Sequence, residues 1–311
     1  MENKTFFHPP YLTINFGEIF SERFIYCSIV MFGYILIIAL NTAVISTIIL
    51  HKSLHEPMYF FIAALCINGL YGSSSFFPGL FYNLLQETKT ISYFACMVQI
   101  FCIHTYGSIE LTLLTAMAYD RYVSICNPLR YNTIMTSSKI FKLITGVLLY
   151  PNILVGVHII LTIRLPLCNT EILKIYCDNW SVVRLSCVDT MVNNIFGLFI
   201  AVCLLGMPLV PILYSYIKIF RVCVKSSKEV RDKALQTCTP HLITIVNFIF
   251  NTFFEILLYR FIPSKLPYEL RVIMSLQFIV MPPILNPIIY GLKMKEIKSR
   301  IIRLFKRNSE K

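Results

Sequence analysis

Seven long stretches of this sequence contain no Asp, Glu, Lys or Arg, and shorter charged segments separate them. Each stretch reaches the roughly 18–20 residues that a helix needs to cross the hydrocarbon core of a membrane. Helices on the surface of a soluble protein instead alternate apolar and polar faces. The pattern therefore predicts membrane-spanning helices within residues 24–50, 57–86, 90–109, 143–163, 190–217, 234–254 and 272–292.

This pattern favours an all-α membrane protein with one domain, a seven-transmembrane helix bundle over residues 24–292. We expect an extracellular N-terminal segment at residues 1–23 and a cytoplasmic tail at residues 293–311. Basic and apolar residues alternate between Lys295 and Lys306. That alternation predicts a short amphipathic helix lying on the membrane lipid.

Composition and charge agree with a membrane location and give the chain an orientation. The 311 residues are 56% hydrophobic and 14% charged, whereas soluble proteins carry roughly 25% charged residues. Of the 28 Lys and Arg residues, 19 fall in the loops and tail on the side of the C-terminus. We expect a plasma-membrane protein, and the positive-inside rule predicts that its N-terminus is extracellular and its C-terminus cytoplasmic. Because these basic residues are split over separate loops, they do not indicate a nucleic-acid site.

The stretch from Met117 to Tyr131 carries the most informative motif, Asp120-Arg121-Tyr122 followed by an Asn-Pro pair. It stands at the cytosolic end of the third span, where Arg121 offers a permanently charged donor. Further strings follow the first span, enter the sixth and end the seventh: Leu54-His-Glu-Pro-Met-Tyr-Phe-Phe, Lys233 to His241, and Asn286-Pro-Ile-Ile-Tyr290. Together they resemble the odorant receptors, a branch of the rhodopsin-like G-protein-coupled receptors, over essentially the whole chain.

The resemblance implies a small-molecule odorant held between spans three, five, six and seven. It also implies coupling to a heterotrimeric stimulatory G protein of the olfactory type, and thus a rise in cyclic AMP, without a cofactor. The implied coupling residues are Asp120, Arg121, Tyr122, Tyr216, Asn286, Pro287 and Tyr290. The candidate pocket, mostly apolar with a few polar groups, comprises Ile103, His104, Gly107, Ser108, Ile200, Ala201, Leu204, Ile249, Thr252, Phe253, Ile256 and Ile279.

Four cysteines fall on the extracellular side, where disulfides form. Three pairings of Cys96, Cys168, Cys177 and Cys187 are open from the sequence itself. The resemblance implies Cys96–Cys177, which would hold the long loop at 165–190 over the bundle as a lid, and Cys168–Cys187. Asn3 begins a glycosylation sequon in the extracellular segment. Asn179 begins a second sequon but follows Cys177 closely, so we expect it to point into the pocket and to stay unglycosylated.

Polar residues inside the spans call for partners, because an unpaired polar group in a membrane is costly. Asn41 should therefore face other helices. Span two carries Gly69 where the resemblance leads one to expect Asp, which leaves Glu110 of span three as either an ion or proton site or a neutral hydrogen-bonded acid. Pro287 frees a backbone carbonyl that Asn286 could satisfy. Glu255 could meet a polar ligand or Arg271.

Other classes fit the sequence less well. A transporter would show internal repeats and a charged pathway, and the sequence shows neither. No nucleophile, phosphate-binding or metalloprotease motif indicates an enzyme. Cys238 and His241 lack the further ligands of a zinc site, so we predict no metal. The alternatives are a non-olfactory rhodopsin-like receptor and, more remotely, a seven-span transporter; the outer part of span three carries no Asp, which argues against an amine receptor.

Overall fold

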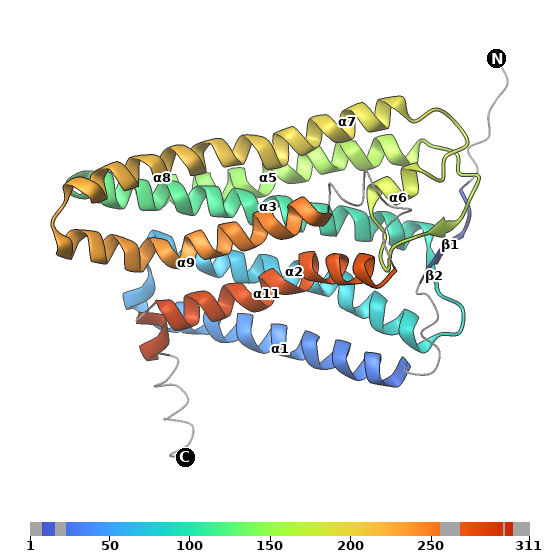
Figure 1. Ribbon diagram of the computed structural model, residues 1–311, viewed down its shortest axis with the longest axis horizontal. Coiled ribbons are helices and arrows are strands. Elements are labelled where there is room, and N and C mark those ends of the chain that lie inside the picture. Colours follow the sequence, from blue (N-terminus) through green and yellow to red (C-terminus); the bar gives the residue numbers. More distant parts are fainter. Residues whose placement is uncertain (1–7, 16–22, 256–267, 295, 301–311) are drawn as a thin grey trace.

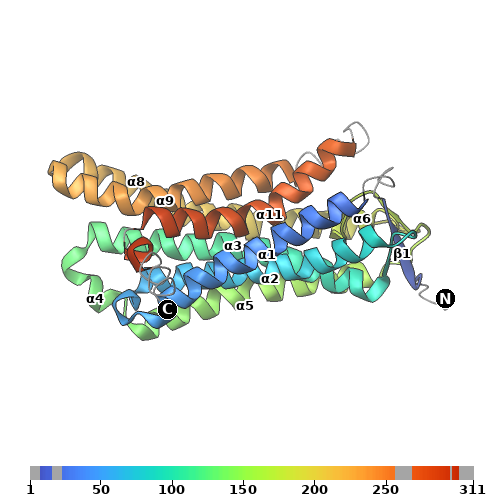
Figure 2. The same cartoon turned by 90° about the horizontal axis from the view of Figure 1, so that it is seen from below.

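The computed structural model describes residues 8–15, 23–255, 268–294 and 296–300. Long helical segments lie side by side in one elongated bundle (Figures 1 and 2). The segments are α1 (Arg23–Leu50), α2 (Pro57–Leu85), α3 (Tyr93–Cys126), α5 (Ser137–Ile163), α7 (Met191–Ala201) continued by the π-helical η3 (Val202–Gly206) and α8 (Met207–Lys225), α9 (Lys228–Phe253) and α11 (Tyr268–Lys293). The predicted seven-helix membrane bundle is thus confirmed.

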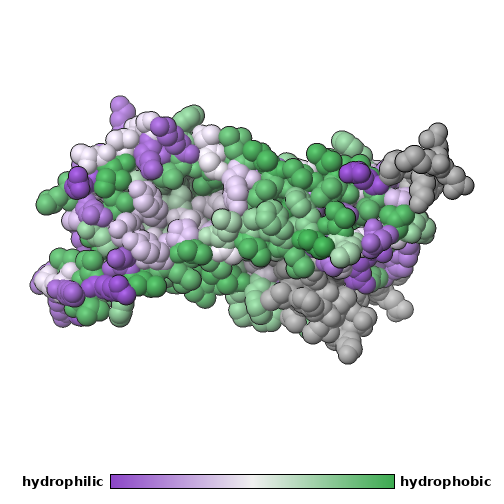
Figure 3. Space-filling view, turned by 90° about the horizontal axis from the view of Figure 1, so that it is seen from above, coloured by the Kyte–Doolittle hydropathy of each residue, from purple (hydrophilic) through white to green (hydrophobic). Residues whose placement is uncertain are grey.

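Six of these segments are long and apolar enough to span a membrane, within the part of the chain that the structure describes. The remaining long segment, α9, is less apolar because it starts with the charged residues of the preceding loop and carries Asn247 and Asn251. It nevertheless packs against α3, α8 and α11. On the face seen in Figure 3, hydrophobic side chains form a broad band between two more polar ends, as a membrane environment requires.

A small sheet covers one end of the bundle, which we call the sheet end. It consists of β1 (Tyr11–Ile14), antiparallel to β2 (Thr90–Ser92) and parallel to β3 (Glu171–Ile172). The short helix α6 (Asn179–Val183) lies beside it (Figure 1). The all-α prediction missed these strands, because elements of two to four residues leave no usable periodicity.

Two disulfides hold the long loop of the sheet end. Cys96 at the start of α3 is bonded to Cys177, and Cys168 is bonded to Cys187. These are the pairs that the family resemblance implies. The backbone N–H of Cys177 also donates to Gln99 Oε1 at 2.9 Å, so the loop is fastened to α3 directly before α6.

The opposite end of the bundle carries the shorter connections η1 (Lys52–Leu54), η2 (Pro128–Arg130) and α4 (Tyr131–Ile134). Residues 296–300 are helical, and Ile297 among them is fully buried. The rest of the predicted amphipathic helix, including residues 301–306, lies outside the described residues. Asn3 and Ile256 also lie outside them.

Helix α3 runs through the middle of the bundle and contacts α2, α5, α8 and α9 (Figure 2). At its midpoint, the fully buried carboxylate of Glu110 accepts hydrogen bonds on both oxygens. Asn68 Nδ2 of α2 donates to Oε2 at 2.8 Å, and Asn286 Nδ2 of α11 donates to Oε1 at 2.5 Å. One acid therefore joins three helices inside the apolar bundle.

The sequence suggested that Asn286 could satisfy the backbone carbonyl freed by Pro287. Asn286 bonds Glu110 instead, and another residue donates to that carbonyl. Pro287 has no N–H, so the carbonyl of Pro283 lacks its helical partner. Asn41 Nδ2 of α1 donates to that carbonyl at 2.8 Å and is itself fully buried. The prediction that Asn41 faces other helices is confirmed. Gly69 permits the close approach, since a Cβ there would lie 3.3 Å from Pro283 Cβ and 3.4 Å from Asn41 Oδ1.

Close packing of α2 against α3 also yields a test. A Cβ at Gly72 would lie 2.4 Å from two ring atoms of Tyr106, which is fully buried. We expect Gly72→Ala to destabilise the purified protein by about 1–3 kcal/mol, the range for overpacking a core. Gly146→Ala is the matched control, because nothing lies within 4 Å of its added Cβ. Thermal unfolding midpoints of the two variants check this, and equal midpoints would contradict the tight α2–α3 contact.

Candidate functional site

A cavity of about 160 Å³ lies at the sheet end between α3, α5, η3, α9, α11 and the loop that carries α6. A buried apolar cavity of about 150 Å³ can hold benzene, so the space suits a small organic molecule. Eight of the twelve predicted pocket residues line it: Ile103, His104, Gly107, Ser108, Ile200, Ala201, Leu204 and Thr252.

Three of the predicted pocket residues do not line the cavity. Phe253 is 55% exposed on the outside of the bundle. Ile279 is fully buried in the main core, and Ile249 packs against that core. The helix phases of α9 and α11 explain the difference, because Phe248 and Phe278 occupy the cavity-facing positions.

The π-helical segment η3 shapes one wall through Leu204 and Leu205. A π segment inserts an extra residue into a helix and changes which side chains face inward. Tyr150 on α5 donates from its hydroxyl to the carbonyl of Cys203 at 2.9 Å, and Thr115 donates to the carbonyl of Pro208 at 3.2 Å. Side chains of neighbouring helices thus satisfy backbone groups within and directly after η3.

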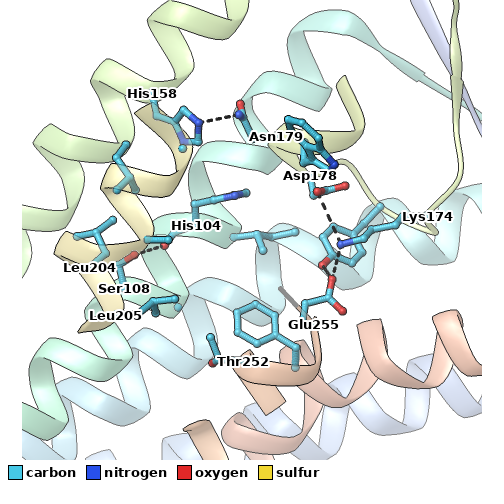
Figure 4. A pocket seen from close by; sticks show the side chains of 18 of the residues that line it. His104, Ser108, His158, Lys174, Asp178, Asn179, Leu204, Leu205, Thr252 and Glu255 are labelled. Carbon is cyan, nitrogen blue, oxygen red and sulfur yellow. Dashed lines mark hydrogen bonds and ion pairs between the residues drawn. The ribbon is translucent and has the colours of Figure 1, made fainter. Parts of the chain in front are cut away.

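Two histidines line the cavity near α6. Nδ1 of His104 lies 2.9 Å from the carbonyl of Ile100, which can only accept, so the neutral ring carries its proton on Nδ1. His158 Nε2 lies 2.9 Å from Asn179 Nδ2 and accepts from it (Figure 4). Asn179 is 3% exposed, and its Oδ1 lies 2.7 Å from the Thr162 hydroxyl. The expectation that Asn179 points into the pocket agrees with this position, and Trp180 also lines the cavity.

A buried charged cluster forms the other polar side of the cavity (Figure 4). Lys174 pairs with Glu255, two residues beyond the end of α9, and lies 3.7 Å from Asp178. The hydroxyl of Tyr176 donates to the same Glu255 oxygen at 2.5 Å. The sequence singled out Glu255 for a polar ligand or Arg271, and the side chain of Arg271 lies outside the described residues. Lys174 was missed, because a loop lysine carries no signal that it will be buried.

At the opposite end of the bundle, Arg121 is 9% exposed and paired with its neighbour Asp120. The hydroxyl of Tyr131 donates to the other oxygen of Asp120 at 2.8 Å. Desolvation and the adjacent carboxylate of Asp120 raise the pKa of Tyr131 above its usual range, so this donor keeps its proton. The structure thus supplies a restraint on Arg121 that the sequence did not reveal.

Other predicted coupling residues lie on α8, α11 and α3 itself. Tyr216 of α8 and His241 of α9 form a hydrogen bond of 2.6 Å between hydroxyl and Nδ1. Tyr290 of α11 is fully buried, and Tyr122 lies 5.9 Å from Tyr214, ring to ring. Within the described residues, no group of three or more His, Cys, Asp or Glu side chains is arranged to hold a metal ion.

Comparison with known proteins identifies the family. A family model described as "Olfactory receptor" matches residues 29–308. Human olfactory receptor 51I2 is 36% identical over 267 residues, covering 85% of each chain. Human olfactory receptor 52N4 is 37% identical over 283 residues, covering 90% of this chain and 87% of its own. Because the family model and these relatives match most of a chain that folds as a seven-helix membrane bundle, the chain belongs to the olfactory receptor family, whose members bind small odorants and couple to G proteins.

Proposed function

We propose that this chain is an odorant receptor that binds its ligand in the sheet-end cavity and activates a stimulatory, olfactory-type G protein at the opposite end, which raises cyclic AMP. The observation that carries the proposal is the path of α3. Ile103 lines the cavity and Arg121 lies in the buried cluster at the other end. The two are about 27 Å apart at 1.5 Å per residue, so one rigid helix connects both sites.

The proposed orientation places the sheet end outside the cell. Both disulfides are at the sheet end, and disulfides persist in oxidising compartments. The opposite end and the tail hold most of the basic residues, in keeping with the positive-inside rule. An odorant would then reach the cavity from the extracellular side, beneath the lid formed by the disulfide-linked loop.

Helix α9 is the element through which the ligand would act. Phe248 and Thr252 of α9 line the cavity, together with Glu255 directly after the helix. His241, midway along α9, is hydrogen-bonded to Tyr216 of α8. A ligand shifts an equilibrium only by binding one arrangement better than another. Contacts that draw the cavity end of α9 inward would swing its opposite end outward, open the Tyr216–His241 contact and expose Arg121 to the G protein.

In this scheme Glu110 serves as the polar junction about which the helices rearrange. Two amide groups donate to its two oxygens, the pattern that a carboxylate accepts. Because both oxygens accept, the pattern fits a charged carboxylate better than the neutral acid that was one of the two alternatives from the sequence.

Arg121 provides the first test of coupling. We expect Arg121→Gln to reduce the odorant-evoked cyclic AMP response at least about tenfold, because a buried charged donor would be lost from the docking surface. Ligand binding, measured by thermal stabilisation of the purified receptor, should be unchanged. Arg130→Gln is the matched control, since Arg130 is exposed beyond the end of α3. An undiminished cyclic AMP response in Arg121→Gln would refute the coupling site.

Glycosylation tests the orientation and the lid together. We expect Asn3→Gln to remove the mobility shift caused by a glycosidase, because Asn3 would face the lumen during synthesis. Asn179→Gln should leave the shift intact, because Asn179 is buried against His158 and Thr162. A glycan on Asn179 would contradict the closed lid, and a chain without any glycan would remove this support for an extracellular N-terminus.

A further inference from the structure

The cavity ends before the level of the Glu110 junction. On α3 the lining stops at Gly107 and Ser108, and Glu110 follows Gly107 by about 4.5 Å along the helix axis at 1.5 Å per residue. The innermost described lining residue of α9 is Phe248, and α11 contributes Phe278. Side chains from three helices therefore separate the ligand space from the fully buried Glu110.

Three aromatic rings close this inner side of the cavity, and we call them the aromatic floor: Tyr106 of α3, Phe248 of α9 and Phe278 of α11. The ring centroids of Phe278 and Tyr106 are 6.2 Å apart, and those of Phe278 and Phe248 are 6.3 Å apart. Both separations are within the range of packed aromatic pairs. Tyr106 and Phe248 are almost completely buried. Phe278 thus packs against both other rings and also lines the cavity.

A glycine on α3 gives the ring of Phe278 its position. A Cβ at Gly107 would lie 2.9 Å from Cζ of Phe278, 3.6 Å from Cε2 and 3.9 Å from Cε1. The tip of the ring therefore rests against the bare backbone of Gly107, closer than a side chain at this position would allow. The ring of Phe278 spans the distance from α11 to α3 and leaves no passage for a ligand toward the middle of the bundle.

The polar groups of the lid lie away from the aromatic floor. Asp178 and Asn179 of the lid loop are on one side of the cavity, whereas Ser108 and Leu205 are on the other (Figure 4). The hydroxyl of Ser108 already donates to the carbonyl of His104 at 2.7 Å. A ligand therefore fits with its polar group near the lid and its hydrocarbon end against the aromatic floor.

We propose that the aromatic floor limits the length of the ligand, with Phe278 as the residue that sets the limit and Gly107 as the residue that positions Phe278. The inference rests on the proposed function, because it names the ligand class of the same cavity. The cavity of about 160 Å³ is close to the 150 Å³ that holds benzene, so the class is compact molecules of about six to eight non-hydrogen atoms.

The limit follows from two opposing effects. Each added methylene that leaves water for the apolar cavity raises affinity about fourfold. Once the chain end meets the ring of Phe278, a further carbon has no space, because Tyr106, Phe248 and the backbone of Gly107 surround the ring. Forcing extra methylenes into a packed interior is unfavourable. Affinity should therefore rise with chain length and then fall abruptly.

The test determines this limit on the purified full-length receptor in lipid nanodiscs. Straight-chain molecules of three to ten carbons are titrated with a hydroxyl, a carboxylate or an ammonium head group, so that the outcome does not depend on one head group. The thermal midpoint reports binding, because a ligand stabilises the state that it binds. We expect the affinity for at least one series to rise about fourfold per carbon and then to fall at least about tenfold within the next two carbons.

A substitution of Phe278 assigns the limit to its ring. Phe278→Leu should move the limit to chains longer by about one or two carbons, because leucine leaves part of the space of the ring empty. Phe61→Leu is the matched control, since Phe61 is fully buried on α2 and is not among the described lining residues. Partition of the ligands into lipid is the same for every variant, so a shifted limit reports the cavity.

Gly107→Ala gives a second variant, should Phe278→Leu fail to fold. Its methyl group would take the place of the ring tip, while Tyr106 and Phe248 pack against the ring on other sides. We expect the ring to move into the cavity and the limit to fall by about one carbon. Gly156→Ala is the control for this variant, because nothing lies within 4 Å of its added Cβ.

The outcomes separate this inference from the proposed function. A series without a limit up to ten carbons overturns the ligand class, as does a panel in which no member binds. A limit that neither cavity variant shifts overturns the roles of Phe278 and Gly107. Length-limited binding without a cyclic AMP response in cells supports the inference and contradicts the proposed coupling. A cyclic AMP response that persists along the whole series does the reverse.

Discussion

The hydrogen-bonded carboxylate of Glu110 is the interaction on which the rest of the bundle depends. It lies fully buried at the middle of α3, and amides from α2 and α11 each occupy one of its oxygens. In a membrane interior an unsatisfied acid is costly. Separating α2 or α11 from α3 would leave Glu110 without a hydrogen bond, so this cost adds to side-chain packing in holding the three helices together. A second polar bond, from Asn41 to the carbonyl of Pro283, ties α1 to the same place.

Each end of the bundle is built to respond to a different environment. At the sheet end, a disulfide-linked loop and a three-stranded sheet cover a cavity with apolar walls and a buried charged cluster. At the opposite end, Arg121 is held by Asp120, and Asp120 by Tyr131. Since α3 contributes residues to both ends and to the central junction, a rearrangement of α9 against α3 can link ligand and partner without any covalent step.

The sequence predicts the membrane helices well because charge-free runs report the solvent around each residue directly. It predicts hydrogen-bond and ion-pair partners inside the bundle poorly, because the paired residues lie far apart in the chain. Asn41 and Pro283 are separated by 242 positions, and Lys174 and Glu255 by 81. Of the pocket residues expected on α9, Thr252 lines the cavity, whereas Phe253 is exposed and Phe248 lines the cavity instead, because a small error in helix phase changes which side chain faces inward. Buried loop residues such as Lys174 and Tyr176 have no periodic signal at all.

The most direct test of the account is the separation of α5 and α9 at the end that carries Arg121. Spectroscopic labels can be attached at Ser138 near the start of α5 and at Arg231 near the start of α9, because both positions are exposed. We expect the distance between the labels to increase when an activating odorant and the G protein are both bound. A distance that stays unchanged while the receptor is signalling would contradict transmission through a rearrangement of the bundle.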